Sequence, residues 1–342
     1  MKGNLRNDVF SGLGLRPADH IVNDATRDMF KDTLDNSHCG HATLPASEDT
    51  TRRSVHSSDS HDDADTPTGR SKFATDASTT HLVLIPSYNP GAKFEETVRS
   101  ARERWNPVWV AVDGSTDGST ARLKAMAVKD PGLHVIVLPY NQGKGAAVLA
   151  ALDEAAALGF THALTMDSDG QHPAHLIDAF MSASQAVPEC MVLGLPRFDA
   201  SAPRLRVQGR RLSNFWADVE TLWAGIGDSL YGFRVYPIAP LRSVMHRQIW
   251  MRRFDFDPEA AVRMCWAGVR PINLEAPVRY FRADEGGVSH FQYGRDNALL
   301  TWMHLRLMFG FVVRSPSLVA QRMLPHLRSV WLRSKQSDKQ RR

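Results

Sequence analysis

The stretch His162-Ala-Leu-Thr-Met-Asp-Ser-Asp-Gly-Gln-His172 joins a short apolar run to a polar loop that contains glycine. The same arrangement occurs three times earlier, because apolar runs also cover residues 81–85, 108–112 and 134–138. Segments with helical spacing lie near residues 94–104, 117–127, 144–158 and 173–187. Short apolar strands that alternate with helices predict βαβ units, and therefore a mainly parallel α/β sheet with helices on both faces.

Polar residues follow each of the four predicted strands. Ligands of an open parallel sheet bind beyond the carboxyl ends of its strands, so these loops are where a site is expected. Turns favour the same residue types for structural reasons alone, but four such loops at one edge of a sheet indicate a ligand site. The loops are Pro86-Ser-Tyr-Asn-Pro-Gly91, Asp113-Gly-Ser-Thr-Asp-Gly-Ser119, Pro139-Tyr-Asn-Gln-Gly-Lys-Gly145 and Asp167-Ser-Asp-Gly-Gln-His172.

The fourth loop carries two carboxylates, Asp167 and Asp169, that are separated by one residue. Both can reach one hard divalent cation, because Mg²⁺ or Mn²⁺ held by one or two carboxylates completes its shell with water and substrate phosphate oxygens. Such an ion would stabilise the charge on a departing diphosphate. Asp-x-Asp-Gly is also a common solvated turn, so the pair alone leaves both interpretations open.

The third loop, residues 141–145, opens a predicted helix. Its glycines would let the backbone approach an anion, the start of a helix favours negative charge, and Lys144 adds a positive charge. The spacing is not that of a Walker A motif, and no Gly-x-Gly-x-x-Gly sequence follows the first strand. Both absences weigh against a nucleotide hydrolase and against a dinucleotide-dependent oxidoreductase.

In order and spacing, the four loops resemble those of the family 2 inverting glycosyltransferases, the group that includes dolichol-phosphate mannose synthase. The resemblance covers about residues 81–200 and implies the GT-A fold, with an acceptor-side extension toward the C-terminus. Two positions depart from the family pattern: Pro90 stands where glutamate is usual, and Val112 where the first of two aspartates is common. They affect the expected recognition of base and ribose and leave the metal pair intact.

The resemblance also implies roles for individual residues. Asp169 would be the main metal ligand, and Asp167 would approach the ribose and the sugar as well as the metal. The remaining donor-side residues would contact the nucleoside or stand beside the sugar nucleotide; they are Pro86, Tyr88, Asp113, Asp117 and Lys144.

Three segments of the second half look familiar in the same family. Residues 228–236, with Arg234, resemble a segment that faces the acceptor. Residues 254–263 resemble the start of the helix that supplies the catalytic acid, so Asp257 and Glu259 are candidates for the base that deprotonates an acceptor hydroxyl. An N-cap role for Asp257 and a first-turn charge for Glu259 are the alternatives. The loop 286–291 would bring His290 to the metal or the diphosphate, although an ordinary surface histidine fits equally well.

Charge and cysteine content narrow the cellular setting. A net charge of +4 gives no reason to expect nucleic acid, but residues 315–342 carry seven Lys or Arg against the single acid Asp338. Such a tail suits an anionic membrane surface, or is simply solvated. The three cysteines share no metal-ligand spacing, and the first residues lack the apolar core of a signal peptide. We therefore expect a cytoplasmic protein, at the inner face of the membrane where it contacts lipid, and no transmembrane helix.

The chain is expected to divide into four segments. Residues 1–79 are polar and predicted to be disordered, 80–200 form the nucleotide-sugar half, 201–313 the acceptor half, and 314–342 a basic tail. The apolar helix near 296–313 is either core or an interfacial membrane helix. The prediction is an inverting, metal-assisted transfer from a nucleotide-diphosphate sugar to a hydroxyl or lipid-phosphate acceptor. A sugar-phosphate nucleotidyltransferase and a non-catalytic sugar- or lipid-phosphate-binding protein are the alternatives.

Overall fold

The structure is a computed structural model that describes residues 76–198, 204–278 and 293–340. The prediction for residues 1–75 and the role proposed for His290 therefore lie outside the described residues. The described residues up to Gln321 belong to one compact unit, and residues 322–340 belong to a second one.

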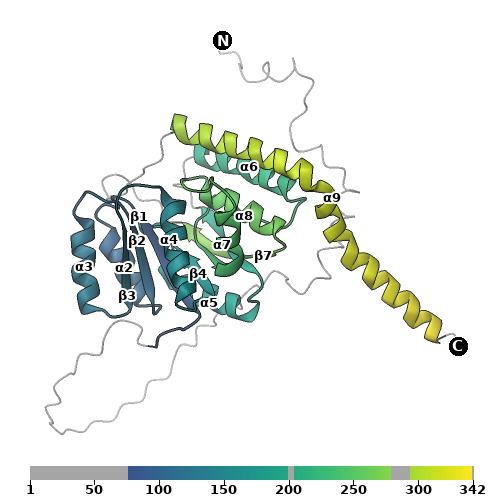
Figure 1. Cartoon of the computed structure of the whole chain (residues 1–342), viewed down its shortest axis with the longest axis horizontal. Helices are drawn as coiled ribbons and strands as arrows, with labels where there is room; N and C mark the ends of the chain where they lie inside the picture. Colours follow the sequence, from purple (N-terminus) through teal and green to yellow (C-terminus); the bar gives the residue numbers. More distant parts are fainter. Residues whose placement is uncertain (1–75, 199–203, 279–292, 341–342) are drawn as a thin grey trace, which may run out of the picture. The chain divides into compact units, whose positions relative to one another are not determined.

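A seven-stranded sheet forms the centre of this unit, with the strand order β3-β2-β1-β4-β6-β5-β7 (Figure 1). The first four strands run parallel to one another, and β6 is antiparallel to both of its neighbours. The predicted mainly parallel sheet is confirmed. The strands are β1 (His81–Ser87), β2 (Val108–Asp113), β3 (Leu133–Leu138), β4 (His162–Thr165), β5 (Met191–Phe198), β6 (Arg234–Pro237) and β7 (Pro271–Val278).

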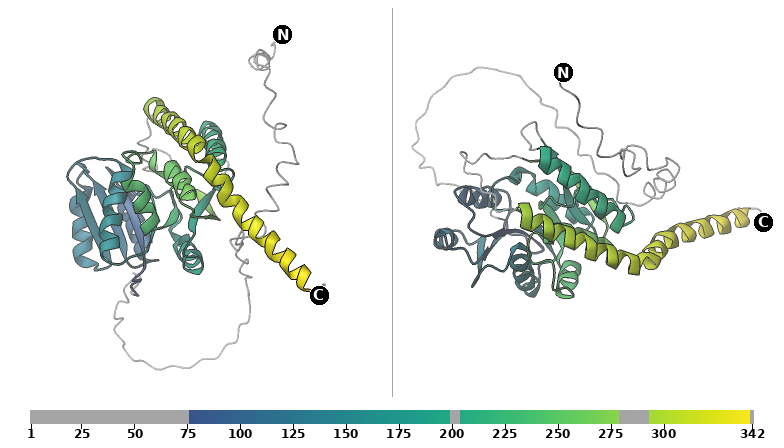
Figure 2. Two further views of the ribbon diagram at one scale, coloured as in Figure 1. Left: turned by 45° about the vertical axis from the view of Figure 1, so that its right-hand side comes forward. Right: turned by 90° about the horizontal axis from the view of Figure 1, so that it is seen from above.

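Helices cover both faces of the sheet (Figure 1 and Figure 2). In β1, Leu82 and Leu84 join the core under α4, α7 and α8, whereas Val83 and Ile85 join the core under α2, α3 and α5. A strand buried on both faces reads as an unbroken apolar run. The helices are α2 (Phe94–Arg102), α3 (Ser119–Lys129), α4 (Lys144–Ala157), the 3₁₀ turn η2 (Ala174–Leu176), α5 (Ile177–Ala186), α6 (Arg204–Glu220), α7 (Ile238–His246), α8 (Phe256–Trp266) and α9 (Tyr293–Gln340).

Strand register brings the polar loops to one edge. Ser87, the last residue of β1, is paired with Val112, and Asp113, the last residue of β2, is paired with Leu138. The loops that follow β1, β2, β3 and β4 therefore begin side by side, as parallel strands require. This register is what positions the site described below.

Helix α9 differs from the prediction at its C-terminal end. The sequence suggested a helix to about residue 313 and a basic tail after it, but α9 continues without interruption to Gln340. Its only prolines, Pro316 and Pro325, lie within this continuation. In the part of the chain that the structure describes, no helix has a stretch long and apolar enough to cross a membrane.

His81, at the start of β1, is expected to make the free energy of unfolding depend on pH. His81 stacks on its strand partner His162 with ring centroids 4.4 Å apart, and its Nε2 lies 3.2 Å from Ser184 Oγ. Burial, and then the neighbouring His162, lower the pKa of His81 from 6.5 to about 4. The unfolded chain then binds more protons than the native one between these values. The contribution of His81 to the free energy of unfolding is therefore fully present above pH 6.5. It is lost as the pH falls toward 4, which lowers the free energy of unfolding by about 3 kcal/mol at most.

We expect His81→Gln to flatten the fall in unfolding free energy between pH 7 and pH 4.5. Urea denaturation across this range measures the fall for the wild type and the variant. His175→Gln, at an exposed position in η2, is the control and should keep the wild-type slope. Equal slopes for the wild type and His81→Gln would contradict the assignment.

Candidate active site

A cavity of about 1270 Å³ lies at the carboxyl ends of the strands. Residues from the β1, β2, β3 and β4 loops line one end of it, and residues of α6 and α9 line the other. Six of the predicted donor-side and metal residues face it together with Asp257; they are Pro86, Tyr88, Asp113, Lys144, Asp167 and Asp169. The remaining predicted residues that the structure describes, Asp117, Arg234 and Glu259, do not line it.

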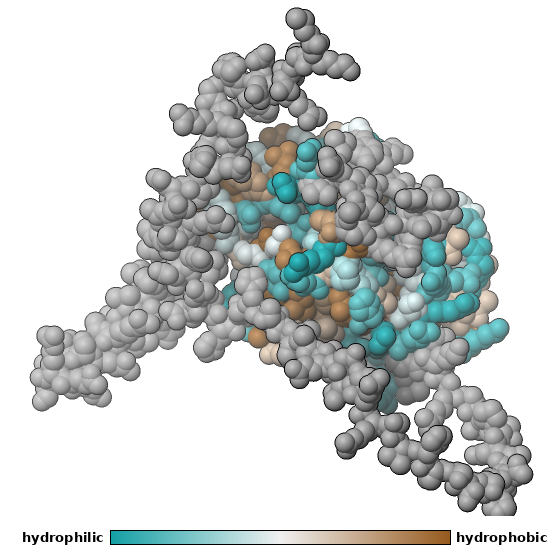
Figure 3. All heavy atoms as spheres, turned by 180° about the vertical axis from the view of Figure 1, so that it is seen from behind, coloured by the Kyte–Doolittle hydropathy of each residue, from teal (hydrophilic) through white to brown (hydrophobic). Residues whose placement is uncertain are grey.

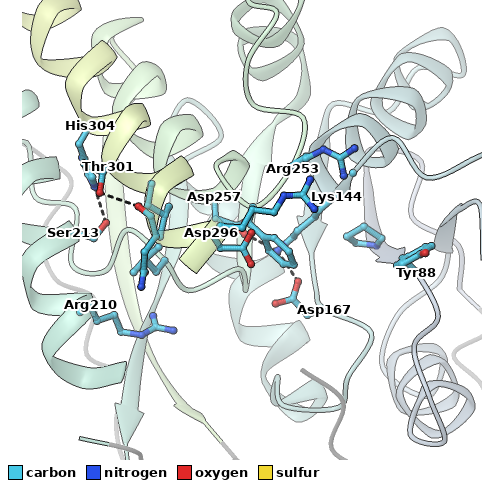
Figure 4. Close-up of a pocket in the computed structure, with 18 of the residues that line it drawn as sticks. Tyr88, Lys144, Asp167, Arg210, Ser213, Arg253, Asp257, Asp296, Thr301 and His304 are labelled. Carbon is cyan, nitrogen blue, oxygen red and sulfur yellow. Dashed lines mark hydrogen bonds and ion pairs between the residues drawn. The ribbon is translucent and has the colours of Figure 1, made fainter. Parts of the chain in front are cut away.

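Lys144 links the two halves of this cavity. It is the first residue of α4, and its Nζ lies 2.6 Å from Asp167 Oδ1 and 2.6 Å from Asp257 Oδ2, between the two carboxylates in Figure 4. Burial alone would lower the pKa of Lys144, but the charges of Asp167 and Asp257 raise it above its usual value. The ammonium group therefore stays charged at any physiological pH. One cation therefore pairs with both Asp167, which follows β4, and Asp257, a candidate base.

Asp167 and Asp169 differ in their electrostatic environment. Burial opposes ionisation of Asp167, yet the charge of Lys144 lowers its pKa to about 2. Burial and the charge of Asp167 instead raise the pKa of Asp169 to about 6. A buried carboxylate beside a second one gains most from an added cation, so Asp169 is the side chain that a metal would stabilise.

His172 supports Asp167 from the same loop, a role that the sequence did not assign to it. The backbone N–H of Asp167 donates to His172 Nδ1 at 2.9 Å, and His172 Nε2 lies 3.5 Å from Asp167 Oδ2. Burial lowers the pKa of His172 to about 4. The ring is therefore neutral at pH 7, which leaves Nδ1 free to accept that bond. The imidazole also meets the rings of Tyr231 and Phe233 edge-on, which fixes its orientation.

The donor set fits a divalent cation only in part. Within the described residues, no group of three or more His, Cys, Asp and Glu side chains converges on one point. Asp167 and Asp169 supply two carboxylates, which suffices for Mg²⁺ or Mn²⁺ when substrate phosphate and water complete the shell. The third predicted ligand, His290, lies outside the described residues.

The glycines of the third loop have a function that the sequence did not predict. A Cβ atom on Gly143 would collide with the carbonyl oxygen of Arg252, and one on Gly145 with that of Met251. The N–H of Ala146 donates to the same Arg252 carbonyl at 3.2 Å. The close approach that these glycines allow is to the loop between α7 and α8, so a protein carbonyl occupies part of the expected anion cradle.

Two aspartates of the second loop hold the backbone. Asp113 faces the cavity, but its two carboxylate oxygens accept the N–H groups of Gln142 and Gly143, both at 2.7 Å. Asp117 accepts the N–H of Ser119 at 3.0 Å and its hydroxyl at 2.5 Å, and so stabilises the start of α3. Asp117 thus orders the turn that precedes α3 and does not line the cavity, where the sugar nucleotide was expected.

The structure separates the two candidate bases. Asp257 lies in the first turn of α8, faces the cavity and has its Oδ1 buried without a hydrogen-bond partner. The N-cap of α8 is Asp255, so the capping alternative for Asp257 is wrong. Glu259 is fully buried and is bound by Arg263 at 2.7 Å and Arg306 at 2.8 Å. Asp257 is therefore the base candidate, and Glu259 holds helices together.

Arg234 is placed beneath the cavity, with no part of it exposed. Its guanidinium donates to the carbonyl oxygens of Tyr231, Asp228 and Asp257, and to the hydroxyl of Tyr236. The expected contact of Arg234 with substrate is not supported by this placement, because all of these partners belong to the protein. The side chain instead fixes the backbone at Asp257.

The end of the cavity that α6 and α9 line holds a buried chain of hydrogen bonds, which no motif in the sequence predicted. His304 of α9 lies with Nδ1 2.9 Å from Glu220 Oε1 and with Nε2 3.0 Å from Ser213 Oγ (Figure 4 labels Ser213 and His304). Glu220 and Ser213 belong to α6, and burial raises the pKa of Glu220. Nearby, Arg210 is paired with Asp228 at 2.6 Å. The two contacts of His304 fasten α9 to α6 along one wall of the cavity.

Comparison with known proteins gives a consistent result. Residues 82–244 match the model of glycosyl transferase family 2, which confirms over this region the family that the four loops resemble. Undecaprenyl-phosphate mannosyltransferase of Micrococcus luteus is 24% identical over 219 residues, 60% of this chain and 85% of that protein. Polyprenol monophosphomannose synthase of Mycolicibacterium smegmatis is 32% identical over 108 residues, 31% of this chain and 41% of that protein. The solved structure of Mycobacterium tuberculosis glucosyl-3-phosphoglycerate synthase has a TM-score of 0.48 at 17% identity, over 69% of this chain and 80% of that one.

The contact between α4 and the α7–α8 loop can be tested by adding one methyl group. We expect Gly145→Ala to lower the free energy of unfolding by about 1–3 kcal/mol, because the new Cβ forces the Met251 carbonyl away. Chemical denaturation measures the loss. Gly209→Ala in α6 is the matched control, since its Cβ would meet no atom within 4 Å. An unchanged stability of Gly145→Ala would show that the two segments are not in contact.

Proposed function

This chain carries a family 2 glycosyltransferase domain over residues 82–244, and from that premise we propose that it moves a sugar from a nucleotide-diphosphate donor to a lipid-phosphate acceptor. The transfer inverts the configuration at the anomeric carbon. The observation that carries the proposal is the bridge of Lys144 between Asp167 and Asp257. This bridge supports a reacting centre that a donor-side carboxylate, Asp167, and an acceptor-side carboxylate, Asp257, can both reach.

On the donor side, we assign the metal to Asp169, with Asp167 and His290 as further ligands. A bound Mg²⁺ or Mn²⁺ would neutralise charge on the leaving diphosphate. Pro86 and Tyr88 lie at the end of the cavity formed by the β1 loop, where they are suited to contact the nucleoside. Lys144 stands between this end and Asp257, so it is suited to hold the sugar nucleotide in line with the acceptor.

On the acceptor side, Asp257 has one of two tasks. It accepts the proton of an attacking hydroxyl, or, when the acceptor is a phosphate monoester that needs no strong base, it fixes the position of that group. The second task is supported by the apolar wall opposite, because Leu212, Leu305 and Met308 line the cavity beside the polar groups. The two relatives named above, an undecaprenyl-phosphate mannosyltransferase and a polyprenol monophosphomannose synthase, agree with a lipid-borne acceptor.

Helix α9 supports contact with a membrane that would present such an acceptor. Trp302 is 50% and Phe309 75% exposed, although Met303 and Leu307 between them are buried in the core. Seen from behind in Figure 3, polar side chains predominate at the end that carries α2 and α3, and apolar ones are more frequent toward α6 and α9. An amphipathic helix of this kind, whose C-terminal part is rich in Lys and Arg, suits the surface of an anionic bilayer on the cytoplasmic side.

The donor reaction provides the test. A panel of UDP- and GDP-sugars with Mn²⁺ should reveal one donor that is hydrolysed or, with a polyprenyl phosphate, transferred. Asp169→Ala should lower turnover about 100-fold or more and weaken Mn²⁺ binding, because the main metal ligand is lost. Asp257→Asn should lower kcat for transfer to a hydroxyl acceptor by a similar factor and leave nucleotide binding unchanged.

Asp178→Ala, at an exposed position of α5, is the control and should behave as the wild type. Equal Mn²⁺ binding and turnover in the wild type and Asp169→Ala would refute the metal assignment. Tight binding of a polyprenyl phosphate without turnover of any donor would favour a binding protein. Release of diphosphate from a nucleoside triphosphate and a sugar phosphate would favour a nucleotidyltransferase.

A further inference from the structure

The loop between α7 and α8, residues 247–255, exposes large apolar side chains, and side-chain hydrogen bonds hold its backbone in place. Ile249 is 79% exposed, and Trp250 and Phe254 are also exposed. The backbone beneath them is fixed, because Asp255 accepts the N–H groups of Met251 and Arg253. Arg252 donates to three carbonyl oxygens, those of Met245, Gln248 and Trp250. Apolar side chains held outward by so many contacts favour a binding surface over an unstructured turn.

This loop adjoins the exposed apolar side of α9. The guanidinium of Arg306 lies 4.0 Å from the centre of the Trp250 ring and 5.9 Å from that of Trp302. Trp250 of the loop and Trp302 of α9 therefore both lie near one arginine. Arg253 and Phe254 line the cavity, so the loop also forms part of its mouth. Exposed apolar side chains of α9 and of this loop therefore lie near Arg306, and the loop reaches the cavity through Arg253 and Phe254.

The charge on the loop determines which partner fits it. Arg247 and Arg253 are exposed, and between residues 238 and 278, a range that the structure describes throughout, Glu275 is the only exposed acid. A second copy of this chain would oppose like charges across such a surface. An anionic bilayer offers both an apolar layer for Ile249 and negative headgroups for the arginines.

We propose that residues 247–255 form a second membrane-contact element, which inserts Ile249 and Trp250 into the headgroup region of an anionic bilayer beside the cavity mouth. The proposal rests on the proposed function in that a lipid-borne acceptor would then enter the cavity directly from the bilayer. It adds a contact point that α9 alone does not supply. Two elements on either side of an entrance also fix its orientation toward the membrane.

Sedimentation of the full chain with vesicles tests the proposal. We expect the wild type to bind vesicles of phosphatidylcholine and phosphatidylglycerol, and Ile249→Glu to bind about tenfold more weakly because an inserted apolar side chain is lost. Arg247→Gln should weaken binding about fivefold, and only when the vesicles are anionic. Val128→Glu, at an 87% exposed position of α3, is the matched control and should bind as the wild type.

Three results would overturn the proposal: absence of vesicle binding by the wild type, unchanged binding by Ile249→Glu, or loss of a wild-type dimer in that variant by sedimentation velocity. Donor hydrolysis without vesicles separates this proposal from the proposed function. Ile249→Glu should retain the wild-type rate there, which also shows that it is folded. A wild type that binds vesicles but turns over no donor would refute the function and leave the membrane contact standing.

Discussion

A single buried ammonium group, Lys144 Nζ, is the contact on which the site depends. It joins the start of α4, the end of β4 and the first turn of α8, segments that are far apart in the chain. A buried charge without partners would cost several kcal/mol, so the two carboxylates and the lysine require one another. The surroundings are shaped to fit, because a Cβ on Gly232 would lie 2.8 Å from this nitrogen. Arg234 then fixes the backbone of Asp257 from below, and His172 fixes that of Asp167 from the side.

The sheet and the donor end of the cavity could be predicted because their signals are local. Each apolar run ends where a polar loop begins, and the parallel register brings these loops to one edge of the sheet. Asp167, Asp169 and Lys144 therefore line one cavity, as expected. The individual roles of Asp117 and Glu259 could not be predicted in this way. A carboxylate that orders the turn before a helix and one that faces substrate look alike in sequence. The contact of Glu259 with Arg306 joins residues 47 positions apart.

The acceptor end lacked such signals for a different reason. Ser213, Glu220 and His304 are ordinary residues of two helices, and only the packing of α9 against α6 brings them into one hydrogen-bonded chain. Their burial is expensive unless each is paired, which makes the contact between the helices specific as well as apolar. Helix α9 thus has a buried side held by His304, Arg306 and Leu307 and an outer side that exposes Trp302, Leu305 and Phe309.

The contact of Gly143 and Gly145 with the carbonyl groups of Arg252 and Met251 has a consequence for how such enzymes diversify. The two glycines and the loop form one steric unit, although more than 100 residues separate them in the printed sequence. A substitution on one side is tolerated only with a compensating change on the other, so the two segments should be inherited together. A chimera that exchanges acceptor halves between relatives would therefore have to take the third-strand loop and the α7–α8 loop from the same parent.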